Sequence, residues 1–256
     1  MYKQTKSVAV IIAFTLAAAL RAQEGAGAPE QRAVLVELFT AEGCSSCPPA
    51  DALLRQVNGS RTSGGLLIVG ISEHVTYWDQ GGWTDPYSSS DYTDRQNAYI
   101  QRFQLESAFT PQMVINGSEQ IVGSDSAALA QAVQKEAEQR PQMSLRILSL
   151  SVAGGKLTVN FSASGDVPAK GVDLIAVLAD DSDKSNVLHG ENAGQMLAHV
   201  SVARSISRVG KMKAAGERTV QIRIPSSFQA SQGHHLILFA QTPGNGRVLG
   251  TDTKPL

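Results

Sequence analysis

The chain has 256 residues, of which 42% are hydrophobic and 18% are charged, as is typical of a globular protein. Its formal net charge is -1, so it lacks the basic excess of a nucleic-acid-binding protein. Two cysteines cannot form a four-thiolate zinc site, and the five histidines show no ligand spacing beside them. These counts argue against a metal site.

The first 22 residues have the pattern of a secretory signal peptide. Lys3 and Lys6 precede an apolar run over residues 8–20, and small residues lead to a cleavage point after Ala22. The run is shorter than the roughly 20 residues that span a bilayer, although an uncleaved anchor is the alternative. We expect a periplasmic or secreted bacterial protein without stable membrane insertion after cleavage of residues 1–22.

Two apolar runs and the helical segment between them predict a parallel βαβ unit. Residues 33–40 (AVLVELFT) and residues 65–75 (GLLIVGISEHV) are typical of buried strands. Residues 48–57 (PPADALLRQV) place their apolar side chains along one stripe of a helix. Parallel strands need such a crossover connection, which favours an α/β sheet.

Residues 76–140 continue the alternation of predicted helices and strands. They are a loop over residues 76–93, a helix over 94–106, a strand–turn–strand hairpin over 109–123 and a helix over 124–140. The hairpin contains an Asn-Gly turn, which is a strong hairpin signal. The last helix has Ser124 or Asp125 as its N-cap, and Pro141 ends it.

From residue 143 the hydrophobic pattern changes to a period of two. The predicted strands include residues 156–163, 172–179, 218–225 and 234–241. Short strands separated by Gly-rich turns predict an antiparallel β-sandwich. The fold prediction is therefore an α/β domain over residues 33–140, with helices flanking a central sheet, followed by a β-sandwich-like domain over residues 143–256.

Both cysteines lie between the first predicted strand and its helix. Sites in open α/β sheets form at the carboxyl ends of strands, and a helix N-terminus lowers the pKa of a nearby thiol. Cys44 is the candidate nucleophile, because it is nearer to the loop, and Cys47 would resolve the mixed disulfide.

Neighbouring residues argue against strong activation of this pair. Pro48 and Pro49 suggest that the regular helix begins near Pro48, which would leave Cys44 up to a turn outside it. The carboxylate of Glu42 would raise a thiol pKa. Three interpretations stay open: a redox-active dithiol, a stable structural disulfide and a metal site, the last being the weakest.

The order of elements resembles that of a thioredoxin-like domain. The resemblance implies that Pro111, after Thr110, follows a cis peptide bond, faces the cysteines and shapes an edge where a substrate strand docks. The segments ELFTAEGCSSCPPAD, SEHVTYWDQGGWTDPYSS, DRQNAY, TPQMVING and GENAGQMLAHVSVAR together resemble the bacterial family called domain of unknown function 1223. That resemblance covers most of the mature chain and implies a secreted thioredoxin-like domain with a β-rich part.

The aromatic loop and the strand before it supply further candidates. Glu73 and His74 could carry protons beside the cysteines, and Trp78 could form a substrate wall or a small-ligand site. The alternative is that the aromatic side chains pack a rigid loop, while its acids cap turns and pair with Arg95. Glu191 and Asn192, in the second half, are interpreted as turn residues with a structural role.

The leading functional hypothesis is a thiol–disulfide oxidoreductase or redox sensor that uses Cys44 and Cys47. Its partner would be a protein or a small thiol or disulfide, and it needs no external cofactor because the dithiol itself carries two electrons. The alternative is a non-enzymatic envelope protein, binding or structural, in which a thioredoxin-like scaffold carries a structural disulfide.

Overall fold

The computed structural model describes residues 32–226, 228 and 233–256. The predicted signal peptide, residues 1–22, lies outside the described residues. Within the described ranges, no helix is both long enough and apolar enough to cross a membrane.

The first half of the described chain alternates strands and helices, as predicted. Its elements are β1 (Ala33–Thr40), α1 (Pro48–Val57), β2 (Leu67–His74), the 3-10 helix η1 (Thr76–Gly81), α2 (Ser90–Phe103), β3 (Gln112–Ile115), β4 (Glu119–Val122) and α3 (Ser126–Glu138). The second half consists of strands: β5 (Met143–Ala153), β6 (Lys156–Gly165), β7 (Val172–Asn186), β8 (Met196–Met212), β9 (Gly216–Arg223), β10 (His234–Gln241) and β11 (Val248–Pro255).

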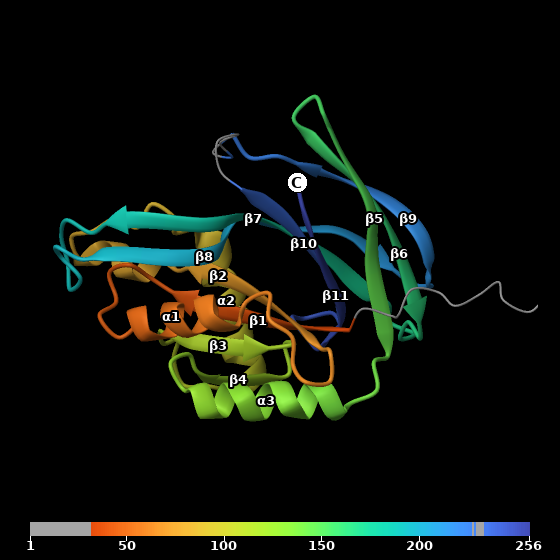
Figure 1. Ribbon diagram of the computed structural model, residues 1–256, viewed down its shortest axis with the longest axis horizontal. Coiled ribbons are helices and arrows are strands. Elements are labelled where there is room, and N and C mark those ends of the chain that lie inside the picture. Colours follow the sequence, from red (N-terminus) through yellow and green to blue (C-terminus); the bar gives the residue numbers. More distant parts are fainter. Residues whose placement is uncertain (1–31, 227, 229–232) are drawn as a thin grey trace, which may run out of the picture. The chain divides into compact units, whose positions relative to one another are not determined.

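A mixed eight-stranded sheet contains strands from both halves of the chain. Its order is β11-β10-β7-β8-β2-β1-β3-β4, with β1 and β2 parallel and β1 and β3 antiparallel. The strands β2 and β8 meet in parallel at Ser72 and Val202. The two predicted segments, residues 33–140 and 143–256, thus contribute to one sheet (Figure 1).

Side-chain hydroxyls add to the short pairing between β2 and β8. Ser72 Oγ donates a hydrogen bond to the carbonyl oxygen of Val200 at 3.0 Å. Ser201 Oγ donates to the carbonyl oxygen of Gly70 at 2.6 Å. These bonds satisfy buried groups that a longer strand ladder would otherwise pair.

The helices cover opposite faces of the α/β part of the sheet. Helices α1 and α3 pack on the face that carries Val36 and Leu38, whereas Tyr92 of α2 packs on the face that carries Leu35. Gly70 permits a close approach of α1, because a Cβ there would lie 2.7 Å from Leu54 Cδ1. Alternate residues of β1 and β2 therefore face α1 and α3 on one side of the sheet and α2 on the other.

A second, antiparallel sheet has the strand order β5-β6-β9. The predicted alternation in residues 156–163 is confirmed, because Leu157, Val159 and Phe161 are fully buried. These side chains share a hydrophobic cluster with Leu236 and Leu238 of β10. The core of the second half thus lies between the small sheet and the adjoining strands of the large one.

Two local predictions needed correction. The helix predicted over residues 94–106 begins earlier, at Ser90, because Ser89 caps it by accepting a hydrogen bond from the Asp91 N–H at 3.2 Å. The loop predicted over residues 76–93 contains η1. The N-cap predicted for α3 is confirmed as Asp125, whose Oδ1 accepts from the backbone of Ala128.

The β3–β4 turn packs against the β10–β11 turn. Gly117 has a φ of 60°, and a Cβ built there would lie 2.3 Å from the carbonyl oxygen of Gly246. Asn116 extends the contact, because its carbonyl oxygen accepts from Val248 N–H at 2.8 Å. The Asn-Gly dipeptide therefore forms the predicted turn and also joins distant parts of the chain.

We expect Gly117→Ala to lower the free energy of unfolding by about 2–4 kcal/mol, since it combines backbone strain with a clash. Gly59→Ala is the matched control. Gly59 has a φ of +75°, but nothing lies within 4 Å of a Cβ there, so only the strain of about 1 kcal/mol applies. Urea unfolding of both variants measures the difference, and equal losses would contradict the close approach.

Candidate functional site

Cys44 and Cys47 form a disulfide in the turn between β1 and α1. Their Cα atoms are 5.4 Å apart, and the turn is closed by a hydrogen bond from Cys47 N–H to the Cys44 carbonyl oxygen at 3.1 Å. Both cysteines are 0% exposed, whereas Ser45 and Ser46 between them are exposed. An attacking thiol would therefore reach the sulfur atoms only after some of their cover moves.

Helix α1 begins where the two prolines predict. Cys47 is the N-cap, and its carbonyl oxygen accepts the first two helical hydrogen bonds, at 2.9 and 3.1 Å. Pro48 and Pro49 occupy the first helical positions and have no N–H to offer. Cys44 thus lies outside the helix, where the helix dipole gives a thiolate little stabilisation.

The structure brings Trp78 and Thr110 to the cysteine loop (residues 40–51). Trp78 packs against the cluster that contains both cysteines, and its Nε1–H donates to Thr110 Oγ1 at 2.7 Å. Ser46 Oγ contacts the Thr110 carbonyl oxygen at 3.5 Å. The Thr110–Pro111 peptide bond is cis, as the resemblance implies.

The turn between β7 and β8 also holds the cysteine loop. Asn192 is 1% exposed, and its Nδ2 donates to the carbonyl oxygens of Glu42 and Cys44 at 2.8 and 2.9 Å. Glu191 Oε2 accepts from Ser45 Oγ at 2.6 Å and from Ser45 N–H at 3.1 Å. These two residues therefore contact the cysteine loop directly.

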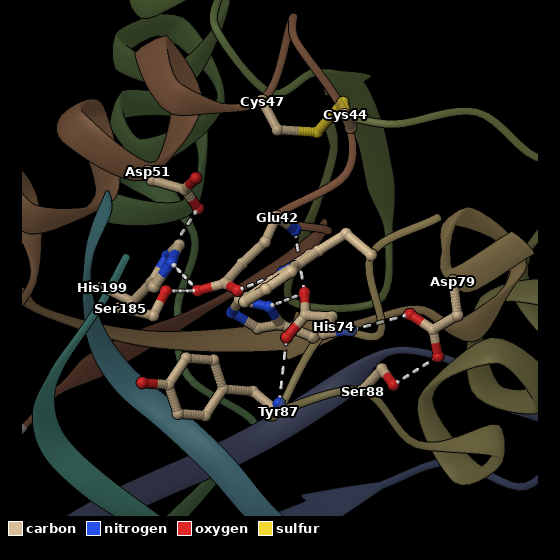
Figure 2. Close-up of polar contacts among 12 residues, drawn as sticks. Glu42, Cys44, Cys47, Asp51, His74, Asp79, Tyr87, Ser88, Ser185 and His199 are labelled. Carbon is tan, nitrogen blue, oxygen red and sulfur yellow. Dashed lines mark hydrogen bonds and ion pairs between the residues drawn. A yellow bond between two sulfur atoms is a disulfide. The ribbon is translucent and has the colours of Figure 1, made fainter. Parts of the chain in front are cut away.

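A buried ion cluster lies beneath this loop. His199 of β8 is 1% exposed, with Nε2 3.3 Å from Glu42 Oε1 and Nδ1 3.6 Å from Asp51 Oδ1. Burial alone would lower the pKa of His199, but the carboxylates of Asp51 and Glu42 outweigh it and raise that pKa to about 10. Figure 2 shows Glu42, Asp51 and His199 gathered below the disulfide, with Ser185 bonded to Glu42.

The aromatic loop (residues 76–89), which precedes α2, joins the same network. His74 Nδ1 is 2.7 Å from Asp85 Oδ2, which also accepts from the Glu42 N–H at 2.8 Å. Trp83 Nε1–H donates to Glu42 Oε2 at 2.7 Å. Burial acts to raise the pKa of Asp85, yet His74 and the backbone N–H donors lower it overall. The indole N–H groups of Trp78 and Trp83 are thus both engaged within the protein, which favours the packing role of this loop.

Glu73, the other predicted proton carrier, points to the opposite face of the sheet. Its neighbour is Arg95, whose Nε lies 3.8 Å from Glu73 Oε1 and forms an ion pair with Glu37. Burial and the charge of Glu37 raise the pKa of Glu73 well above its usual value. Arg95 thus pairs with Glu73, one of the acids expected to pair with it, and its other carboxylate partner is Glu37 of β1.

Sequence reasoning missed His199 as a neighbour of the cysteines. The local pattern gave no such signal, because His199 and Ser201 alternate with the apolar Ala198, Val200 and Val202, which predicts an exposed face. The structure buries His199 instead, and a buried histidine requires polar partners. Their identity was not readable, because Glu42 and Asp51 lie far away in the chain.

A Ser–His–Asp arrangement occurs elsewhere, across the neighbouring strands β8, β7 and β10. Ser201 Oγ is 2.9 Å from His235 Nε2, and His235 Nδ1 is 2.5 Å from Asp181 Oδ1. Ser201 is 0% exposed and its hydroxyl donates to the Gly70 carbonyl oxygen. The hydroxyl thus secures β2 to β8 and is not presented to a substrate. Across the described residues, no group of three or more histidine, cysteine, aspartate or glutamate side chains is placed to hold a metal ion.

We expect His199→Gln to lower the free energy of unfolding by about 3–5 kcal/mol at pH 6, because it leaves buried carboxylates unpaired. The folded-state pKa of His199, about 10, lies above the ordinary value of about 6.5. Its stabilisation is therefore complete below pH 6.5 and is lost as the pH rises through about 10.

The difference between wild type and His199→Gln should thus shrink between pH 6.5 and 10, as measured by urea unfolding at several pH values. The exposed His189, replaced by Gln, is the control and should leave the profile unchanged. A constant difference across this range would contradict a protonated His199.

Comparisons with known proteins agree with this architecture. The chain matches a protein from Agrobacterium tumefaciens solved by X-ray crystallography, with 24% identity and a TM-score of 0.65, over 88% of this chain and 95% of that one. It also matches HBP35 of Porphyromonas gingivalis, with 13% identity and a TM-score of 0.63, over 89% of this chain and 76% of that one. Both likenesses show the fold alone, and no curated protein matches the chain. A model described as "Protein of unknown function (DUF1223)" matches residues 35–241, and the chain therefore belongs to the DUF1223 family.

Proposed function

We propose that this protein is a thioredoxin-like thiol–disulfide oxidoreductase or redox sensor in which Cys44 and Cys47 are the reacting pair. The observation that carries the proposal is the position of the disulfide, at the junction of the carboxyl end of β1 with the N-terminus of α1. Sites in open α/β sheets form at such junctions.

The surroundings of the disulfide support a thioredoxin-like assignment. Helices on both faces of the sheet, the Cys-x-x-Cys turn and the adjacent Thr110–Pro111 segment occur in the expected order. In this proposal residues 33–140 form the thioredoxin-like part and residues 143–256 the β-sandwich-like part. A stable cysteine pair also suits a periplasmic or secreted protein, since disulfides persist outside the cytosol.

The reaction is thiol–disulfide exchange. A partner thiolate attacks Cys44, a new S–S bond forms, and Cys47 leaves as a thiolate that takes a proton from solvent. A second thiolate of the partner then attacks the partner sulfur of the mixed disulfide and releases Cys44, so the partner dithiol is oxidised and the protein pair is reduced. The reverse steps reduce a partner disulfide and restore the Cys44–Cys47 bond. Neither direction needs a bound cofactor.

The geometry favours the oxidised form of the pair. A cysteine thiolate is stabilised by cations or by a helix N-terminus, and a stable thiolate makes a disulfide more oxidising. Here Cys44 lies outside α1, and its neighbour Glu42 is a carboxylate. We therefore expect a low reduction potential for the Cys44–Cys47 pair, close to that of thioredoxin.

The complete burial of both cysteines favours a second candidate function. Both cysteines are 0% exposed, and Asn192 anchors the turn that contains them. A structural disulfide in a non-enzymatic envelope protein, binding or structural, would have this appearance. The two candidates differ in how readily the disulfide is reduced.

We expect a reduction potential between about -300 and -230 mV, bracketing the value typical of thioredoxin. Equilibration of the folded protein with dithiothreitol redox buffers, followed by alkylation and mass spectrometry, measures it.

Cys47→Ser should trap a mixed disulfide at Cys44 with reduced, unfolded protein substrates after mild oxidation, whereas the matched variant Cys44→Ser should trap little. A potential well below -300 mV, with no turnover of insulin disulfides, would favour the structural disulfide.

A further inference from the structure

The segments around the disulfide carry acids and no lysine or arginine. The cysteine loop (residues 40–51), the aromatic loop (76–89), the segment before β3 (106–112) and the β7–β8 turn (187–195) contain six acidic residues: Glu42, Asp51, Asp79, Asp85, Glu106 and Glu191. The protonated His199 offsets part of the charge of Glu42 and Asp51. Glu191 is exposed and forms no ion pair with any residue that the structure describes, so its charge lies uncompensated at the surface beside the cysteine loop.

The Glu191 carboxylate is held in a defined place. Its Oε2 accepts from both the side chain and the backbone N–H of Ser45, at 2.6 and 3.1 Å. These hydrogen bonds lower the pKa of Glu191, which keeps it ionised. The next residue, Asn192, is buried and fixes the turn on the carbonyl oxygens of Glu42 and Cys44.

The β7–β8 turn has its own closing contacts. Gly194 N–H donates to the Val187 carbonyl oxygen at 2.7 Å, and Val187 N–H donates to the Gln195 carbonyl oxygen at 3.0 Å. Gly190 lies against the aromatic loop, where a Cβ would be 3.5 Å from Trp83 Cβ. The Glu191 carboxylate therefore belongs to a turn that is held together by its own hydrogen bonds and packed on the cysteine loop. An isolated charged side chain at the surface would not be fixed in this way.

We propose that Glu191 determines which thiols react with the Cys44–Cys47 disulfide, by disfavouring anionic thiols and favouring neutral or cationic ones, such as cysteines in basic polypeptide segments. This inference rests on the proposed exchange activity. In the first step a thiolate approaches Cys44, forms an S–S bond and releases Cys47 as a thiolate, which is then protonated. A glutathione thiolate brings additional carboxylates to this step, whereas a cysteamine thiolate brings an ammonium group that Glu191 attracts.

The test compares the rates at which cysteamine, 2-mercaptoethanol and glutathione reduce the disulfide of the folded full chain. The measurement is made at pH 8 for all three thiols. Each rate is divided by the rate of the same thiol with 2-hydroxyethyl disulfide, which removes differences in intrinsic nucleophilicity. Alkylation of Cys44 and Cys47 with iodoacetamide, read by mass spectrometry, follows the reaction.

We expect the normalised rate for cysteamine to exceed that for glutathione by about five- to tenfold at low ionic strength, and less in 0.5 M NaCl because salt screens exposed charges. Glu191→Gln should reduce the ratio at least about threefold, since it removes the charge while keeping an oxygen that can accept from Ser45. Glu217→Gln, at an exposed carboxylate on β9 in the other sheet, is the matched control and should leave the ratio unchanged.

Equal normalised rates for the three thiols, or an unchanged ratio in Glu191→Gln, would overturn the selectivity while leaving the exchange activity standing. If none of the thiols reduces the folded protein, both the selectivity and the oxidoreductase function fail. The two failures are thus distinguishable.

Discussion

The buried imidazolium of His199 is the interaction on which the environment of the disulfide depends. It lies between Glu42, which precedes Cys44 in the cysteine loop, and Asp51, in the first turns of α1. Burial of two carboxylates without a cation would cost several kcal/mol, and the cation comes from β8 in the other half of the chain. The α/β part thus cannot bury its own acids without β8.

Other residues near the tip of the β7–β8 hairpin also contact the segment that contains the cysteines. The hairpin contributes Ser185 to Glu42, Glu191 to Ser45 and Asn192 to the cysteine loop. Figure 1 shows the hairpin extending over the part of the molecule that contains α1. The chemical character of the cysteines is therefore set jointly by residues close to them in sequence and by a hairpin about 150 residues further along the chain.

Local patterns were sufficient for much of the fold. The βαβ unit, the Asn-Gly hairpin turn and the alternation in residues 156–163 each depend on residues near one another in the chain. The joining of β2 to β8 could not be predicted, because Ser72 and Val200 are 128 residues apart and their pairing has no local signature. The same limit applies to the site. The position of Cys44 was readable from its flanking strand and helix, but its burial and its ion cluster depend on long-range contacts.

The complete burial of the disulfide has a consequence for the order of events as the chain is made. The two cysteines are three residues apart, so their ring can close as soon as the turn between β1 and α1 exists. Their cover includes residues as late as His199, which emerge on the order of ten seconds later at ordinary synthesis rates. Until the β7–β8 hairpin docks, its residues do not cover the pair, and after docking each exchange requires some of that cover to move. The timing of oxidation relative to hairpin docking thus becomes part of the protein's maturation.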